Sequence, residues 1–184
     1  VTQRPDQGED AIEKAIVEYE TLEPLIDLEQ AMVSKTLIYE ECGSNIVMGT
    51  VEMGMPDNTG DEIFKDCEVV VKGRFMNQRV APCPLEARGS AATWINGRLI
   101  QWISTQHAQG VRTEVVKANK IDAENVRIIT PDVGGGFGAK ISAYSEELLL
   151  GNIAKHVGKA VRWRETRSES MISLGHGRAQ LQYI

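Results

Sequence analysis

Apolar and polar residues alternate regularly only from residue 61 onward. Such alternation places successive side chains on opposite faces of a strand, so short runs rich in Val, Ile and aromatic residues predict strands. The predicted strands cover residues 67–75, 90–95, 98–104, 125–130, 160–164 and 179–184. Asn96 and Gly97 separate the second strand from the third, and both residues tolerate the positive φ of a type I′ turn. We therefore expect a β-hairpin over residues 90–104.

Apolar residues at helical spacing predict two main helices, over residues 109–119 and 145–156. Four apolar residues define the inner face of the second helix: Leu148, Leu149, Ile153 and Val157. Three charged residues are expected to face water: Glu146, Glu147 and Lys155. Gly158 suits the position just after the helix. Strands and helices in this order predict an α+β fold with a mixed sheet, a β-hairpin and two main helices.

The first third of the chain is less regular. Residues 10–15 and 27–33 favour short helices, and residues 16–20 favour a strand. Glycines and a Pro-Asp-Asn-Thr-Gly run interrupt residues 34–60, which we interpret as a linker. The predicted organisation is a remnant of a preceding domain over 1–33, the linker over 34–60, and a second domain over 61–184. Because the last residues have the pattern of a strand, we expect the chain to be part of a longer protein.

Composition narrows the class of protein. Apolar residues make up 42% of the 184 residues and charged residues 25%, which is typical of a water-soluble domain with a real core. The net charge of −6 and the lack of a basic run argue against nucleic-acid binding. Three scattered cysteines show no metal-binding spacing and indicate a reducing, cytoplasmic compartment. No stretch is apolar enough for a membrane span.

A glycine-rich loop is the strongest candidate for chemistry. Gly134, Gly135, Gly136 and Gly138 surround Phe137, so the backbone N–H groups can approach a ligand closely. With a strand before and a helix after, these N–H groups would suit an anion or a metal-bound oxygen.

Three other interpretations of the glycine loop remain open. It can be a tight turn without chemistry. It also satisfies the dinucleotide pattern G-x-G-x-x-A, with Glu165 as the acid that would bind a ribose, although three residues separate the strand from the first glycine and a hairpin precedes it. A phosphate-binding P-loop fits less well, because Lys140 follows no glycine and precedes no Ser or Thr.

Two further segments carry candidate groups. Gln106 ends a Ser-Thr-Gln run at the exit of the hairpin, where its amide could donate to an oxygen ligand or a carbonyl, although a surface role is the default for glutamine. The Pro-Leu-Glu segment ends in Glu86. Glu86 and Arg88 could pair with each other or could order a neighbouring loop. Cys83 is expected to be a small buried apolar residue, since no histidine lies near it to activate it.

These motifs together, in this order, resemble one protein family. Four motifs carry the likeness: Pro84-Leu85-Glu86, Ser104-Thr105-Gln106, Gly134–Lys140 and Thr166-Arg167-Ser168-Glu169. Val126-Arg127-Ile128 and Val161-Arg162-Trp163, which precede the last two, add to it. They resemble the large, molybdenum-cofactor-binding subunit of the xanthine dehydrogenase, aldehyde oxidase and CO dehydrogenase family. Residues 16–20 with Pro24 resemble the end of the hammerhead domain of that family, so residues 61–184 would be the first part of the molybdopterin-binding domain.

The resemblance implies a function and a set of roles. Such a subunit hydroxylates a carbon substrate, an aldehyde, an N-heterocycle or CO, with water as the oxygen source. Gln106 would donate a hydrogen bond to an oxygen ligand of molybdenum, and Phe137 and the backbone of the four glycines would contact the cofactor. Implied cofactors are molybdenum–molybdopterin, as the cytosine dinucleotide or a related form, with FAD and iron–sulfur clusters on a medium and a small partner subunit. The general base would lie in the remaining part of the subunit.

Two departures leave the substrate open. Many members of the family have a histidine shortly before Pro-Leu-Glu, where this chain has Ala81-Pro82-Cys83, and some have an acid after the loop lysine, where this chain has Ile141. Two alternatives to a molybdenum hydroxylase are a split or degenerate chain with a structural or assembly role, and a domain of an NAD-dependent dehydrogenase.

Overall fold

The computed structural model describes residues 1–46 and 64–184, and the chain divides into two compact units, Val1–Val71 and Lys72–Ile184. The predicted linker covers residues 34–60, and its residues 47–60 lie outside the described residues. The assignment of residues 1–33 to a preceding domain stays a prediction.

Short helical segments make up the first unit: α1 (Asp6–Glu13), α2 (Leu28–Val33) and the 3₁₀ helix η1 (Glu40–Cys42). The carboxylate of Asp27 accepts a hydrogen bond from the N–H of Gln30 at 2.8 Å and caps α2. The two predicted helices are confirmed, the first with an earlier start at Asp6. The predicted strand over residues 16–20 is wrong, since these residues pair with no strand and their side chains are exposed.

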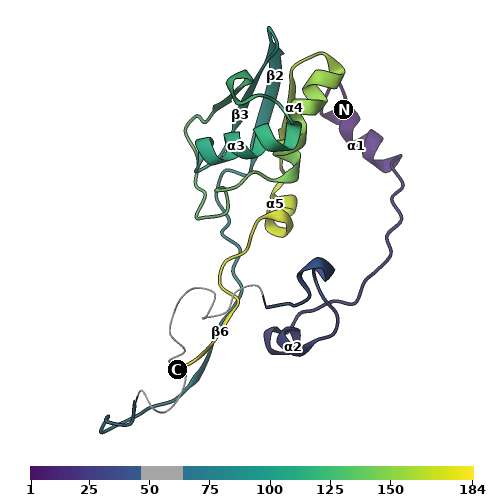
Figure 1. Ribbon diagram of the computed structural model, residues 1–184. Coiled ribbons are helices and arrows are strands. Elements are labelled where there is room, and N and C mark those ends of the chain that lie inside the picture. The colour runs from purple at the N-terminus through teal and green to yellow at the C-terminus, as the bar shows by residue number, and fades with distance from the viewer. Residues whose placement is uncertain (47–63) are drawn as a thin grey trace. The chain divides into compact units, whose positions relative to one another are not determined.

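A four-stranded sheet organises the second unit (Figure 1). Its strands are β2 (Gly89–Ile95), β3 (Arg98–Ile103), β4 (Val126–Ile129) and β5 (Val161–Arg164), in the order β4-β3-β2-β5. β2 is antiparallel to β3 and β5, whereas β3 and β4 are parallel. Asn96 and Gly97 have φ of 50° and 79°, which confirms the predicted type of turn. The mixed sheet and its helices confirm the predicted α+β class.

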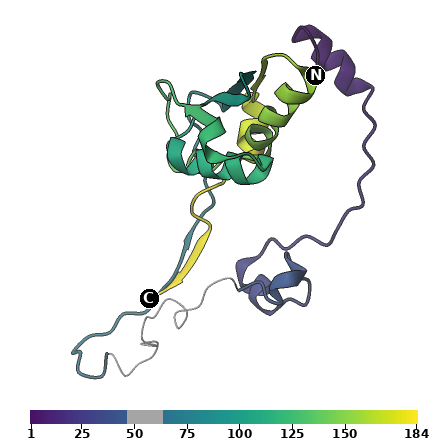
Figure 2. The same ribbon diagram turned by 45° about the horizontal axis from the view of Figure 1, so that its top comes forward.

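Two helices cover the buried face of this sheet, α3 (Ala108–Asn119) and α4 (Ser145–Val157), and they also pack against each other (Figures 1 and 2). The 3₁₀ helix η3 (Ala123–Asn125) precedes β4, and α5 (Arg167–Ser173) follows β5. Alternate residues of the hairpin strands face the helices, as the burial pattern of β3 shows. The core is formed by Ala92, Leu99, Ile103, Val111, Val115, Val126, Leu150 and Ala154.

Small residues set how α4 meets the sheet, and the predicted face of α4 is only partly confirmed: Leu148 packs against the core. The buried residues are Glu147, Leu150, Gly151 and Ala154, whereas Leu149 and Val157 are largely exposed. A Cβ on Gly151 would lie only 2.8 Å from a methyl group of Leu99. The carbonyl of Gly151 accepts a hydrogen bond from Trp94 Nε1 at 2.8 Å. Close approach of the helix backbone therefore decides which face is buried, and the size of its apolar side chains does not.

The remaining strands, β1 (Arg74–Asn77) and β6 (Gln180–Tyr183), form a two-stranded antiparallel ribbon that runs away from the sheet (Figure 1). The predicted strand over 179–184 is confirmed. The one predicted over 67–75 is mostly wrong, because the strand begins at Arg74, where pairing with Tyr183 starts. No helix of the described residues is long and apolar enough to cross a membrane.

Candidate functional site

The glycine loop leaves β4 in conformations that favour glycine. Gly135 and Gly138 have φ of 99° and 89°, in the region that side chains with a Cβ rarely adopt. Phe137 also has a positive φ, 53°, and its side chain is 75% exposed. The packing of a core does not require a strained backbone that exposes an aromatic ring. This combination therefore marks the loop as a candidate site.

The expectation that the loop leads directly into a helix is wrong. Residues 139–144 intervene, and α4 begins only at Ser145. The N–H groups of the glycine loop are therefore not those of the N-terminus of α4. Their orientation is set instead by side chains from two other segments.

Gln106 follows the end of β3, as predicted, and its amide lies against the glycine loop. Its Oε1 accepts hydrogen bonds from the backbone N–H of Gly138 at 3.0 Å and of Lys140 at 3.2 Å. Because both partners are donors, the oxygen must face them and the amide NH₂ must face away. Among the described residues, no acceptor bonds to Nε2. A Cβ on Gly136 would lie within 2.6 Å of Gln106 Cγ. The Gln106 side chain can therefore occupy this position only because residue 136 is glycine.

Glu86 holds both ends of the same loop. Its Oε2 accepts from the N–H of Gly134 at 2.8 Å and from Lys140 Nζ at 2.9 Å, and the hydroxyl of Ser104 donates to it at 2.6 Å. Burial opposes ionisation, but the hydrogen bonds from Ser104, Lys140 and Gly134 outweigh it, so the pKa of Glu86 lies below its ordinary value. Glu86 pairs with Lys140 and not with Arg88, so the first of the two expected roles is wrong, whereas the second, ordering a neighbouring loop, is confirmed.

Arg88 belongs to a second buried ion pair. Its guanidinium donates to Glu165 Oε1 at 2.7 Å, and the two side chains are 1% and 0% exposed. Burial raises the pKa of the Glu165 carboxyl, but the hydrogen bonds and charge of Arg88, with Ser173, bring it below its ordinary value. Because Glu165 is bonded to Arg88, it is not placed to bind a ribose. The dinucleotide-binding interpretation therefore lacks the acidic residue that it requires.

Tyr144 connects this pair to the glycine loop. The Arg88 guanidinium lies 4.0 Å from the centre of the Tyr144 ring. The Tyr144 hydroxyl donates to the carbonyl of Ala139 at 2.7 Å and accepts from the N–H of Gly175 at 3.0 Å. The end of the glycine loop is thus fixed to the buried part of the fold.

Glu147 is buried, 2% exposed, where the sequence pattern placed it in water. Burial raises the pKa of Glu147 to about 7, against the opposing effects of the Tyr144 N–H and the charge of Arg88, and the charges of Glu146 and Glu165 raise it further. Its Oε2 accepts from the N–H of Tyr144 at 2.9 Å, so the carboxyl caps the first turn of α4.

The raised pKa of Glu147 predicts a pH-dependent stability. Between pH 4.5 and 7 the folded protein binds a proton that the unfolded chain releases, so this contribution to the free energy of unfolding is complete below pH 4.5 and is lost as pH rises through 7. The loss is about 3 kcal/mol. Urea unfolding at pH 5, 6, 7 and 8 should show the decline, and Glu147→Gln, which keeps the acceptor for Tyr144, should flatten it. An unchanged slope in the variant would contradict the assignment.

Other candidates from the sequence are not part of this site. Cys83 is exposed, contrary to expectation, and its thiol donates to Met171 Sδ at 3.1 Å. His176 Nδ1 accepts from Arg79 at 2.7 Å. Nowhere in residues 1–46 and 64–184 do three or more His, Cys, Asp or Glu gather so that they could hold a metal ion.

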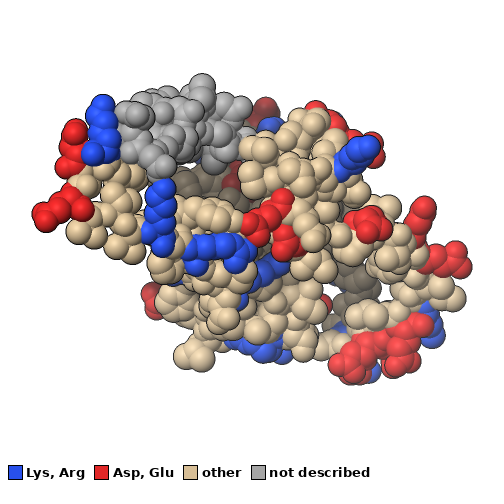
Figure 3. All heavy atoms as spheres, turned by 90° about the horizontal axis from the view of Figure 1, so that it is seen from below, with Lys and Arg blue, Asp and Glu red and all other residues tan. Residues whose placement is uncertain are grey.

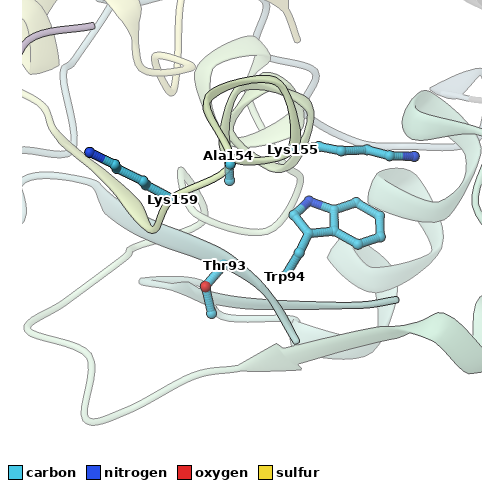
Figure 4. Close-up of a pocket in the computed structure, with 6 residues that line it drawn as sticks. Thr93, Trp94, Ala154, Lys155 and Lys159 are labelled. Atoms are coloured by element: carbon cyan, nitrogen blue, oxygen red, sulfur yellow. The ribbon is translucent and has the colours of Figure 1, made fainter. Parts of the chain in front are cut away.

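A hollow of about 330 Å³ lies elsewhere, between the end of β2 and the C-terminus of α4 (Figure 4). Lys155 Nζ lies 4.9 Å from the centre of the Trp94 ring, while Lys159 points away from that ring (Figure 4). A lysine in the last turn of a helix, over a tryptophan, is stabilised by the helix carbonyls and the ring. On the face in Figure 3, basic and acidic side chains are interspersed. Neither surface competes with the glycine loop as a candidate.

Known proteins match this chain over most of its length. Residues 38–184 match the family model of the molybdopterin cofactor-binding domain. The chain is 32% identical over 180 residues to the nicotine 6-hydroxylase large subunit of Paenarthrobacter nicotinovorans. This alignment covers 96% of this chain and 22% of that protein. It is 31% identical over 182 residues to the carbon monoxide dehydrogenase large chain of Hydrogenophaga pseudoflava, covering 92% and 23%.

A solved structure agrees with the sequence matches. Quinoline 2-oxidoreductase from Pseudomonas putida 86 superposes with a TM-score of 0.84 and 31% identity, covering 98% of this chain and 23% of that one. The chain therefore spans less than a quarter of the length of these relatives. The match of the family model over residues 38–184 means that this chain belongs to the family of molybdopterin cofactor-binding domains.

Proposed function

We propose that this chain forms one wall of the cofactor site in the large subunit of a molybdenum hydroxylase. One observation carries the proposal: the oxygen of the Gln106 amide is held by two backbone N–H groups, so its NH₂ is turned away from those donors and is left for another acceptor beside the glycine loop. Relatives named as nicotine 6-hydroxylase and carbon monoxide dehydrogenase support the same activity.

The groups at the loop fit a molybdenum–pterin cofactor. Amide and backbone N–H groups hydrogen-bond to oxygen atoms without competing as ligands of a metal. Gly136 has no side chain, and the space that a Cβ would take is occupied by the side chain of Gln106. The exposed ring of Phe137 supplies an apolar wall that would exclude water next to those donors.

In this proposal each residue has a defined part. Gln106 donates a hydrogen bond to an oxygen ligand of the metal, and Gly134, Gly135, Gly136, Phe137 and Gly138 contact the cofactor through their backbone. When bound, molybdenum–pterin supplies the two-electron oxidation that hydroxylates a carbon with oxygen from water. The substrate is an aldehyde, an N-heterocycle or CO.

The rest of the enzyme completes the site. We place the general base in the remaining part of the subunit, and FAD and the iron–sulfur clusters on partner subunits in the cytoplasm. The pterin would be the cytosine dinucleotide or a related form. An assembly role without cofactor and an NAD-binding role are not favoured, because the relatives are molybdenum hydroxylase subunits and Glu165 is buried with Arg88.

Gln106→Glu tests the proposal, because it keeps an oxygen for the N–H groups of Gly138 and Lys140 and replaces the donor NH₂ by an acceptor. The complete subunit should retain molybdenum and pterin, whereas the variant should turn over at least about 100-fold more slowly, the cost of losing one preorganised donor. Metal analysis, pterin fluorescence and dye reduction measure the three quantities.

Gln109→Glu, an exposed change on α3, is the matched control and should keep full activity. The chain expressed alone should hold neither molybdenum nor pterin. A complete subunit without molybdenum, or a Gln106→Glu variant with normal turnover, would contradict the proposed function.

A further inference from the structure

Lys140 is joined by its main chain to the segment that carries Gln106. Its carbonyl accepts from the N–H of Gln106 at 2.8 Å and from the hydroxyl of Thr105 at 2.7 Å. Its own N–H donates to Gln106 Oε1 at 3.2 Å. Three hydrogen bonds therefore connect one residue of the glycine loop to residues 105 and 106.

The side chain of Lys140 is joined to two more segments, and it is fully buried. Nζ donates to the carbonyl of Glu86 at 2.8 Å, to Glu86 Oε2 at 2.9 Å and to Ser104 Oγ at 2.9 Å. An ammonium group has three N–H donors, so all are used. An unpaired buried ammonium would be costly, hence this side chain has one favourable position, and it fixes the backbone at residue 140.

We propose that Lys140 is the positioning residue for the amide of Gln106. The anchored ammonium holds the peptide of residue 140 where its N–H, together with that of Gly138, meets Gln106 Oε1. This contact turns the NH₂ of Gln106 outward. The inference deepens the proposed function and rests on it only for the identity of the ligand that this NH₂ meets.

The geometry separates positioning from other roles. Lys140 does not touch substrate or cofactor as a catalytic residue would, because its side chain is enclosed and each N–H is bonded within the protein. Arginine cannot replace it, because a planar guanidinium does not direct three donors from one nitrogen. We therefore expect Lys140→Arg to behave like a loss of the lysine.

Lys140→Met in the complete subunit tests the proposal by hydrogen exchange. In protein from cells that cannot make the pterin, peptides that span residues 134–141 should exchange at least about tenfold faster than in the natural protein, because the hydrogen bonds from Gly138 and Lys140 to Gln106 open. In protein that carries cofactor, kcat should fall while KM changes little.

Two controls make the result specific. Val115→Ala lowers the stability of the same core without touching the loop, so it should speed exchange throughout the domain and not selectively at 134–141. Lys117→Met, an exposed lysine on α3, should change nothing. If Lys140→Met does not fold, Ser104→Ala removes only one acceptor of the ammonium and should show the same local effect at smaller size.

The outcomes separate this inference from the proposed function. Unchanged exchange at 134–141 in a folded Lys140→Met or Ser104→Ala variant would overturn the positioning role, even in an enzyme full of molybdenum. Rescue by Lys140→Arg would also overturn it. Faster exchange in the variant, with a natural protein that binds no molybdenum, would support the positioning role and reject the proposed function.

Discussion

Arg88→Met is expected to lower the free energy of unfolding by about 3–5 kcal/mol, the usual cost of removing one partner of a buried ion pair. The change leaves Glu165 charged and 0% exposed, with the backbone N–H of residue 88 and the hydroxyl of Ser173 still donating to its carboxylate but without the guanidinium charge. The Tyr144 ring also loses the cation that lies 4.0 Å above it. Urea denaturation followed by circular dichroism measures the loss.

The partner of the ion pair decides how the loss is interpreted. In the double variant Arg88→Met with Glu165→Leu both buried charges of the pair are gone, and Glu146, the other partner of Arg88, is 43% exposed. A substantial part of the lost stability should therefore return. Arg162→Met, an exposed change on the neighbouring strand β5, should cost less than about 0.5 kcal/mol. A loss below about 1 kcal/mol for Arg88→Met would contradict a buried, uncompensated Glu165.

Local signals predicted the elements of the second unit well. The turn of the hairpin requires positive φ at Asn96 and Gly97, and few residue pairs tolerate it. The position of the hairpin could therefore be predicted from these two residues. Gly158 ends α4 with φ of 67° for the same reason. These features depend on the backbone of one or two residues and not on partners far along the chain. Sequence can therefore identify them.

Partners of buried charges could not be predicted in the same way. Glu86 bonds to Lys140 across 54 residues and Arg88 to Glu165 across 77, whereas Glu86 and Arg88 are close in sequence and do not pair. Which charges meet depends on strand order and on the path of the glycine loop. The sequence offered one signal for the first of these pairs. Glu86 and Lys140 both lie inside motifs in which a charged side chain exposed to water would have no evident role.

The site was predicted to a similar extent. The position of Gln106 at the exit of β3 is confirmed, but the sequence alone neither placed its amide beside the glycine loop nor showed which amide atom faces that loop. Two backbone donors, from Gly138 and Lys140, decide this. The predicted face of α4 was correct for Leu148 but missed Gly151 and Ala154, because small residues are weak in any hydrophobic pattern although they allow close packing.

Gly136→Ala is expected to abolish most of the activity of the complete enzyme while the protein still folds. A methyl group at residue 136 would lie within 2.6 Å of Gln106 Cγ, and a flexible glutamine side chain moves more easily than a backbone. The displaced Gln106 loses the N–H groups of Gly138 and Lys140 and no longer aims its NH₂. Turnover should fall by about 100–1,000-fold, as when a preorganised donor is removed, while the free energy of unfolding falls by about 1–3 kcal/mol at most.

Two other glycines separate the causes of that loss. A Cβ on Gly177 meets nothing within 4 Å and its φ is not positive, so Gly177→Ala should keep both stability and turnover. Gly138→Ala also meets no atom within 4 Å, but its φ of 89° makes the backbone costly, so it should lose stability by about 1–2 kcal/mol. The contradicting outcome is a Gly136→Ala variant with normal turnover, whose loop peptides exchange hydrogen as in the natural protein. In that case Gln106 has another position, and the close approach at Gly136 does not control its donor NH₂.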